Sequence, residues 1–345
     1  MTIQQPIRKF VGSLFAGALI LGMAACSGGD DPTEGPAAAG SGGSSSGGSN
    51  AAGTSSSGTG NVIPTDPDQI VGTFAIQIKV DKSMTAVVGQ VGDGPVPSNL
   101  VWTEKSKEGD CRLKTPKSPF CEERCEGGVC VADGKCQPYA KPHSVGAVTL
   151  TGVKVEGGGS EIALKEIAAA YQPPAGTVLA YPPFGAEDTI EVHAVGADYP
   201  AFDLSAAGVN PIDLATTDFA LSPDKPLVLE WDAAPSGAAS QMHVKIDLSH
   251  HGGVKGLIEC DAPDTGSLTI SQEMIAELIG LGVAGYPSVV LTRTSIDTVQ
   301  LDHGRVQLEV SALVERYLTT PGVVSCTTKE DCPDGQLCES DATCQ

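Results

Sequence analysis

Aromatic and basic residues are scarce in this chain of 345 residues, and each shortage argues against a class of function. Aromatics make up 4% of the sequence, with two tryptophans, which disfavours a glycosidase cleft or a sugar-binding platform of stacked rings. Lysine and arginine number 21, against 42 aspartates and glutamates. This acidic excess argues against nucleic acid as a partner and is compatible with cationic partners or divalent ions.

Several functional motifs are also missing. No Asp-x-Asp-x-Asp-Gly loop is present, so the sequence does not support a dedicated calcium site. No glycine-rich phosphate loop precedes a helix, and we predict no cofactor. The stretch Gly43-Ser44-Ser45-Ser46-Gly47 has the spacing of a hydrolase nucleophile elbow, but no strand precedes it and no helix follows.

The amino terminus carries an export signal. Arg8 and Lys9 precede an uncharged apolar stretch at 10–25, whose 16 residues are fewer than the roughly 20 of a membrane-spanning helix. Small residues lead into a cysteine as Met23-Ala24-Ala25-Cys26. A charged start, a short apolar run and small residues at the exit are typical of a secretory signal peptide, here 1–25.

The segment ending at Cys26 resembles the signal of bacterial lipoproteins, whose lipobox ends in a cysteine. The resemblance implies cleavage before Cys26 and acylation of Cys26, with palmitate among the chains that anchor it in the membrane. Ser27, in place of Asp, favours the outer membrane, with the protein facing the periplasm or the cell surface. Residues 26–68 are rich in Gly, Ser and Ala, and we expect a disordered tether there.

The cysteine count supports export independently. With one of the 11 cysteines lipidated, ten remain, an even number that suits disulfides formed outside the cytoplasm. They fall into a predicted insert at 103–140, a single cysteine at 260 and a C-terminal tail with C-x₅-C spacing. The disulfide candidates are Cys111, Cys121, Cys125, Cys130, Cys136, Cys260, Cys326, Cys332, Cys338 and Cys344.

The five cysteines of the insert leave one without a partner. We favour a bridge from one of them to Cys260, the alternative being a free, buried Cys260. The tail resembles short Cys-rich repeats of secreted proteins through Asp331-Cys332-Pro333, Gly335 and Cys338, which implies a small extracellular knob and no activity. A zinc site is the tail's other interpretation, although such sites use closer cysteine pairs.

The body between 69 and 322 predicts a mainly β fold. Apolar residues alternate with polar ones in several runs, such as Phe74-x-Ile76-x-Ile78, and Gly- and Pro-rich turns separate the runs. Short strands between such turns predict antiparallel β-sandwich domains with one short helix. Ser271 caps that helix, Gln272–Ile279, and a weaker second helix is predicted at 161–170.

The length of the body favours two β domains. We place the boundary near residue 205, giving a first domain at 69–204 that carries the Cys-rich insert, a second at 205–322 and the tail at 323–345. One continuous β domain is the alternative.

One polar cluster offers weak candidates for a metal or catalytic site: Asp247, His250 and His251. The string Ser249-His250-His251-Gly252 resembles a stretch of β-lactamase-type metallo-hydrolases, but the His-x-His-x-Asp-His motif of those enzymes is absent. Adjacent histidines on a strand point to opposite faces, so a shared ion would require a turn. Asp302-His303 is a further candidate for a Ser/His/Asp triad.

The sequence therefore predicts a membrane-anchored, envelope-exposed lipoprotein that binds, adheres or scaffolds and is not an enzyme. Its expected partners are the membrane, through the lipid, and a protein of the envelope or surface. The alternatives are an exported metal- or His/Asp-dependent hydrolase with a site near His250, and a calcium-dependent binder that uses the acidic surface.

Overall fold

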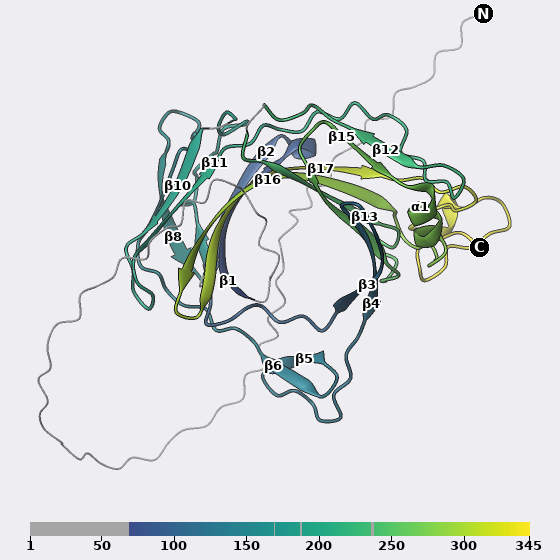
Figure 1. The fold of residues 1–345 in the computed structure, drawn as a ribbon, viewed down its shortest axis with the longest axis horizontal. Coiled ribbons are helices and arrows are strands. Elements are labelled where there is room, and N and C mark those ends of the chain that lie inside the picture. Colours follow the sequence, from purple (N-terminus) through teal and green to yellow (C-terminus); the bar gives the residue numbers. More distant parts are fainter. Residues whose placement is uncertain (1–68, 169, 187, 236–237) are drawn as a thin grey trace, which may run out of the picture. The chain divides into compact units, whose positions relative to one another are not determined.

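A computed structural model describes residues 69–345, apart from 169, 187 and 236–237 (Figure 1). The predicted signal peptide, Cys26 and the tether lie outside the described residues. In the described part, no helix has the length and apolar character needed to cross a membrane.

Strands dominate the described residues, which confirms the predicted mainly β fold. They form 17 strands, the helix α1 (Gln272–Ile279) and two short 3₁₀ turns. The strands are β1 (Ile70–Lys79), β2 (Met84–Val91), β3 (Val101–Glu108), β4 (Cys111–Lys117), β5 (Gly128–Ala132), β6 (Lys135–Pro138), β7 (Val148–Thr151), β8 (Glu161–Ile167), β9 (Ala170–Gln172), β10 (Thr189–Ala194), β11 (Phe202–Ala207), β12 (Leu227–Glu230), β13 (Gln241–Asp247), β14 (Leu257–Pro263), β15 (Ser267–Ile270), β16 (Ser288–Leu301) and β17 (Gly304–Tyr317).

Thirteen strands form one sheet in the order β11-β10-β7-β8-β9-β2-β1-β17-β16-β13-β14-β4-β3. All its neighbours pair antiparallel except β1 and β17, which run parallel, with Phe74 opposite Leu308. The first described strand therefore lies in the middle of the sheet, beside the last one. The long hairpin of β16 and β17 pairs with β1 on one side and with β13 on the other.

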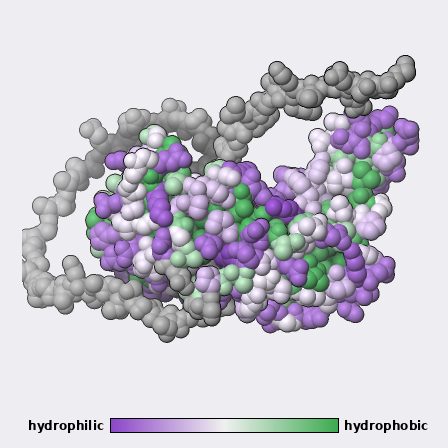
Figure 2. Space-filling view, turned by 90° about the horizontal axis from the view of Figure 1, so that it is seen from above, coloured by the Kyte–Doolittle hydropathy of each residue, from purple (hydrophilic) through white to green (hydrophobic). Residues whose placement is uncertain are grey.

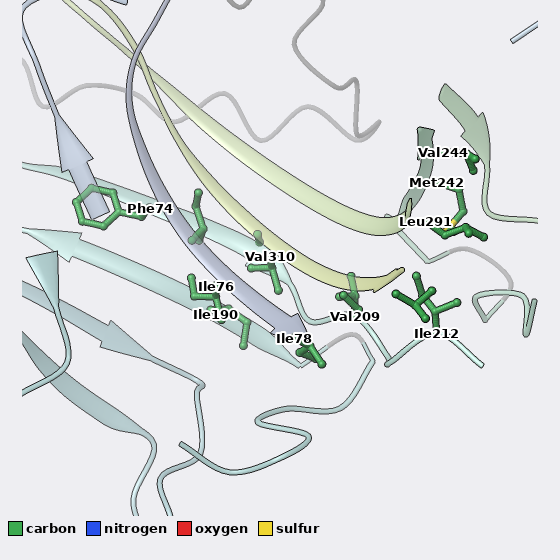
Figure 3. Packing of buried hydrophobic residues seen from close by; sticks show 14 of the residues in the cluster. Phe74, Ile76, Ile78, Ile190, Val209, Ile212, Met242, Val244, Leu291 and Val310 are labelled. Carbon is green, nitrogen blue, oxygen red and sulfur yellow. The ribbon is translucent and has the colours of Figure 1, made fainter. Parts of the chain in front are cut away.

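One end of this sheet folds back over its middle. The backbone N–H of Ser205 in β11 donates to Asp297 Oδ2 in β16 at 2.7 Å. The rings of Phe74 and Phe202 lie 6.2 Å apart, and Figure 3 shows Ile190 of β10 close to Ile76 of β1 within the same apolar cluster. Two layers of strands thus enclose a core, as expected for a β-sandwich, although one layer contains the parallel pair β1 and β17.

A second layer covers the other end of the sheet. Met242 and Val244 of β13 belong to the buried cluster, together with Leu229 of the β12–β15 pair and Ile275 of α1. Figure 3 shows Ile212 on the same side of the sheet as Met242. Burying these apolar faces is the main stabilising contribution, at roughly 25 cal/mol per Å² of apolar surface.

The predicted helix is confirmed at Gln272–Ile279. The side chain of Ser271 accepts the backbone N–H of Met274 at 3.2 Å, which satisfies one of the unpaired donors of the first turn. The predicted helix at 161–170 is wrong, because Glu161–Ile167 forms β8. In β8 the buried residues Ile162 and Leu164 alternate with exposed ones, so the local period is two.

A buried ion pair lies beneath the second layer. Arg293 Nε donates to Asp264 Oδ2 at 2.6 Å, and both side chains are almost fully buried. Burial raises the pKa of Asp264, but the hydrogen bonds from Arg293, Trp231 and Ser240 outweigh it, and the net pKa is below the usual value. Trp231 is itself buried.

The predicted domain boundary falls within β11. Strands from both sides of residue 205 share the large sheet; β3 and β4, for example, pair beyond β14 at its end. The described residues belong to one compact unit. The division into 69–204 and 205–322 stays a prediction, whereas the sharing of one sheet is a structural fact.

Candidate functional site

All ten cysteines of the described residues are paired in disulfides. The pairs are Cys111–Cys260, Cys121–Cys130, Cys125–Cys136, Cys326–Cys338 and Cys332–Cys344. Among the described residues, two cysteine triplets have sulfurs close enough to share an ion, and both consist of these disulfide cysteines. Oxidised sulfur is not the thiolate that zinc requires.

Cys111 belongs to the large sheet and not to the projecting part of the insert. It lies in β4 directly opposite Cys260 of β14, with 4.0 Å between the Cα atoms. This is the bridge that we favoured from the odd cysteine count. It ties β4 to the second half of the chain across 149 residues of sequence.

The remaining four cysteines of the insert hold a small module around the hairpin of β5 and β6, which projects from the sheet in Figure 1. The module is about 20 residues long, from 118 to 139, because β3 and β4 are part of the sheet. The Cys121–Cys130 and Cys125–Cys136 bridges fasten the preceding loop to this hairpin. Disulfides replace the hydrophobic core that so short a segment cannot form.

Two aromatic residues stand exposed on this module. Phe120 is 70% exposed and Tyr139 is 58% exposed. Both line an open depression of about 740 Å³, whose wall also includes Glu123, Arg124 and Glu126. Exposed aromatic side chains that flank a depression are typical anchors of protein interfaces.

Backbone hydrogen bonds fix both aromatic residues to the hairpin. The N–H of Gly134 donates to the carbonyl of Phe120, and the N–H of Tyr139 donates to the carbonyl of Gly127, each at 2.9 Å. The N–H of Phe120 also donates to Asp133 Oδ1 at 3.1 Å. The rings are therefore presented on a constrained backbone, which lowers the entropy cost of binding.

The charges of the module are partly neutralised. Lys117 Nζ lies 2.7 Å from Asp133 Oδ2, and this hydrogen bond, with that from the Phe120 N–H, holds the pKa of Asp133 below its usual value. Within the described residues, Glu122, Glu123 and Glu126 make no ion pair and are exposed. These three carboxylates outnumber the two cations of the module that make no ion pair, Arg124 and Lys135. On the face drawn in Figure 2, hydrophilic residues cover much of the surface and apolar residues form smaller patches.

Asp247, His250 and His251 lie near one another but do not converge on one point. Asp247 Oδ1 accepts the N–H and the hydroxyl of Ser249, at 2.8 and 3.0 Å. The rings of His250 and His251 lie 3.9 Å apart, and His251 takes a positive φ of 64° in the turn after β13. The groups of potential metal ligands found among the described residues do not include these three.

Sequence reasoning missed three histidine–aspartate pairs, whose members are 10, 18 and 55 residues apart in the chain. In each, the histidine Nδ1 lies within hydrogen-bonding distance of a carboxylate: 3.1 Å for His143–Asp198, 2.6 Å for His193–Asp203 and 2.8 Å for His243–Asp261. The hydrogen bond from His243 is the largest cause of the lowered pKa of Asp261. The pairs arise from strand register and loop contacts, which leave no local signal in the sequence.

His303, a triad candidate, packs edge-on against Tyr199, which also contacts His143. Burial, with the nearby charges of three aspartates, raises the pKa of Tyr199. Ser144 follows His143, but its hydroxyl donates to Glu166 at 2.8 Å. That serine is therefore not activated by the adjacent His143–Asp198 pair.

Comparisons with known proteins add little. No protein-family model matches the chain, and no curated protein matches it. Among solved structures, the FN1–FN3 domains of chicken CNTN1 are similar over 68% of this chain and 72% of that one, at 7% identity and a TM-score of 0.17. A TM-score this low carries no argument about fold or function.

The signal for Phe120 and Tyr139 was present in the sequence. Both aromatics border the dense cysteine run, one residue before Cys121 and three after Cys136, in a chain with few aromatics. A disulfide-stapled segment has little core to bury them in. That combination predicts exposure.

Proposed function

We propose that the protein is a lipid-anchored envelope protein of the outer membrane that acts as a non-enzymatic binding module. Cys26 carries the lipid, and the tether at 26–68 holds the folded part away from the bilayer. The stapled module at 118–139 carries the partner-binding surface. The observation that carries the proposal is the pair of exposed aromatics, Phe120 and Tyr139, beside one depression on a projecting, disulfide-fixed hairpin.

Disulfide usage supports the exported location. The described residues contain five disulfides and no unpaired cysteine. Disulfides persist in oxidising compartments and are rare in the cytosol. This supports the lipobox interpretation without depending on it.

The anchor is tested by replacing Cys26 with alanine in the native host. We expect the wild type to fractionate with outer membranes after a high-salt wash, and C26A to lose the lipid and leave that fraction. Mass spectrometry of the wild-type N-terminal peptide should find acyl chains on Cys26. A wild-type protein that begins at an unmodified Met1 would refute the anchor.

The binding surface is tested by photo-crosslinking in intact cells. A photoreactive amino acid at Glu123, on the rim of the depression, should yield a discrete crosslinked species. The same amino acid at Asp224, which is exposed and distant in sequence, serves as the control. Loss of the Glu123 product in F120A/Y139A supports the proposal. Equal products from both positions, or none from Glu123, would contradict it.

A further inference from the structure

The depression on the stapled module combines two features, exposed aromatic side chains and carboxylates that make no ion pair. Phe120 and Tyr139 supply the rings, and Glu123 and Glu126 lie in the same wall. The aromatic contacts found among the described residues include neither ring. With 70% of Phe120 and 58% of Tyr139 exposed, part of each ring is available to a partner.

Aromatic faces and carboxylates both attract cations. A lysine or arginine placed over a ring interacts with its quadrupole, by about 0.5–1 kcal/mol at exposed sites. A neighbouring carboxylate adds a charge-assisted hydrogen bond. Asp133 already pairs with Lys117, whereas Glu122, Glu123 and Glu126 remain free for a partner.

The charge of the whole chain favours the same class of partner. The sequence has 42 acidic residues against 21 basic ones, so the surrounding field is negative. Such a field attracts cationic polypeptides before contact and raises their association rate. One positive group in the wall, Arg124, is outnumbered by the free carboxylates.

We infer that the depression at 118–139 binds a lysine- or arginine-rich polypeptide segment, with cationic side chains over Phe120 and Tyr139 and between Glu123 and Glu126. The inference rests on the proposed binding function and names the class of partner. An extended segment suits an open depression because its side chains can reach the rings without a deep cavity.

The test uses the full mature chain with its disulfides intact and three labelled hexapeptides: hexa-arginine, hexa-glutamate and a neutral Gly-Ser peptide. Fluorescence anisotropy measures the dissociation constants at low salt and at 0.3 M NaCl. We expect hexa-arginine to bind and the other two not to bind. F120A/Y139A should weaken hexa-arginine binding at least tenfold, and E123Q/E126Q should weaken it several-fold and reduce its salt dependence.

Matched variants distinguish a site from diffuse charge. D224N/D334N removes two exposed carboxylates elsewhere, and Tyr317→Ala removes a ring that is 68% exposed. Both should bind hexa-arginine as the wild type does. Equal losses in E123Q/E126Q and D224N/D334N would overturn the inference, as would the absence of binding. If the peptide fails while the Glu123 crosslink still depends on Phe120 and Tyr139, the binding function stands and only the cationic class falls.

Discussion

The projecting part of the insert, at 118–139, and the tail at 323–345 share one disulfide pattern. In each, four cysteines pair first with third and second with fourth: Cys121–Cys130 and Cys125–Cys136 in the insert, Cys326–Cys338 and Cys332–Cys344 in the tail. Neither segment has enough apolar residues for a core of its own. The two modules nevertheless relate to the sheet in different ways.

The tail packs against the body, whereas the insert projects from it. Gly285 donates its N–H to the carbonyl of Asp341 at 2.6 Å, and Cys326 and Thr343 are 1% and 4% exposed. The insert contacts the body through Gln137, whose side chain donates to the carbonyl of Pro95 at 3.2 Å, and through the exposed ion pair of Asp133 with Lys117 of β4. A shared cysteine pattern thus specifies local structure, and the residues between the cysteines decide whether the module packs or projects.

The bridge between Cys111 and Cys260 should give the largest stability effect, because it lies in the sheet and spans 149 residues. Removing it in C111A/C260A frees a long loop in the unfolded chain and should lower the free energy of unfolding by about 4 kcal/mol. Urea denaturation of the oxidised proteins measures this. A loss below about 1 kcal/mol would mean that this bridge contributes no more to the free energy of unfolding than a disulfide of the small modules.

Much of this architecture could be predicted from local patterns. The alternation around Phe74 and the Ser271 cap depend on neighbouring residues, so β1 and α1 were correctly placed. Cysteine parity led to the bridge at Cys260. The helix prediction at 161–170 is wrong because the good helix formers in this segment hid its period of two. Pairing with β7 stabilises the strand instead.

Long-range pairing was beyond such reasoning. The parallel contact of β1 with β17, and the location of β3 and β4 beyond β14, join segments far apart in sequence. For the site, the cysteines were identified but Phe120 and Tyr139 were not. The sequence points instead to Asp247 and His250, because adjacent polar residues are conspicuous in a sequence. In the structure, Asp247 accepts the N–H of Ser249 in the turn after β13.

Removing one disulfide from each module should show which of the two modules contributes to the stability of the body. C332A/C344A loosens the tail and its contacts with Gly285, so we expect the body to lose about 1–2 kcal/mol of unfolding free energy. C121A/C130A should change the unfolding free energy of the body by less than about 0.5 kcal/mol. Calorimetry measures the unfolding transition of the body, and limited proteolysis measures the opening of the insert. Equal shifts of the body transition in both variants would contradict the difference between the packed tail and the projecting insert.

A finer difference lies in the groups that lower the pKa of an exposed aspartate in each module. The hydrogen bond to the Lys117 side chain is the largest cause of the lowered pKa of Asp133 in the insert. In the tail, the backbone N–H groups of Thr328 and Thr327 lower the pKa of Asp331. Carboxylates with lowered pKa values stabilise the fold above their unfolded pKa, and this contribution is lost as the pH falls through the folded value.

Salt should therefore act unequally on the two carboxyl groups. At 1 M NaCl the Debye length falls to about 3 Å, so the attraction from Lys117 weakens and the pKa of Asp133 should rise towards its usual value. Asp331 should respond less, because neutral N–H donors act through short hydrogen bonds. NMR titration of the carboxyl carbons between pH 2 and 6 measures both. Lys117→Met is the control: it should raise the pKa of Asp133 at low salt and leave that of Asp331 unchanged. Equal salt responses would show that general field effects, and not these local partners, set both values.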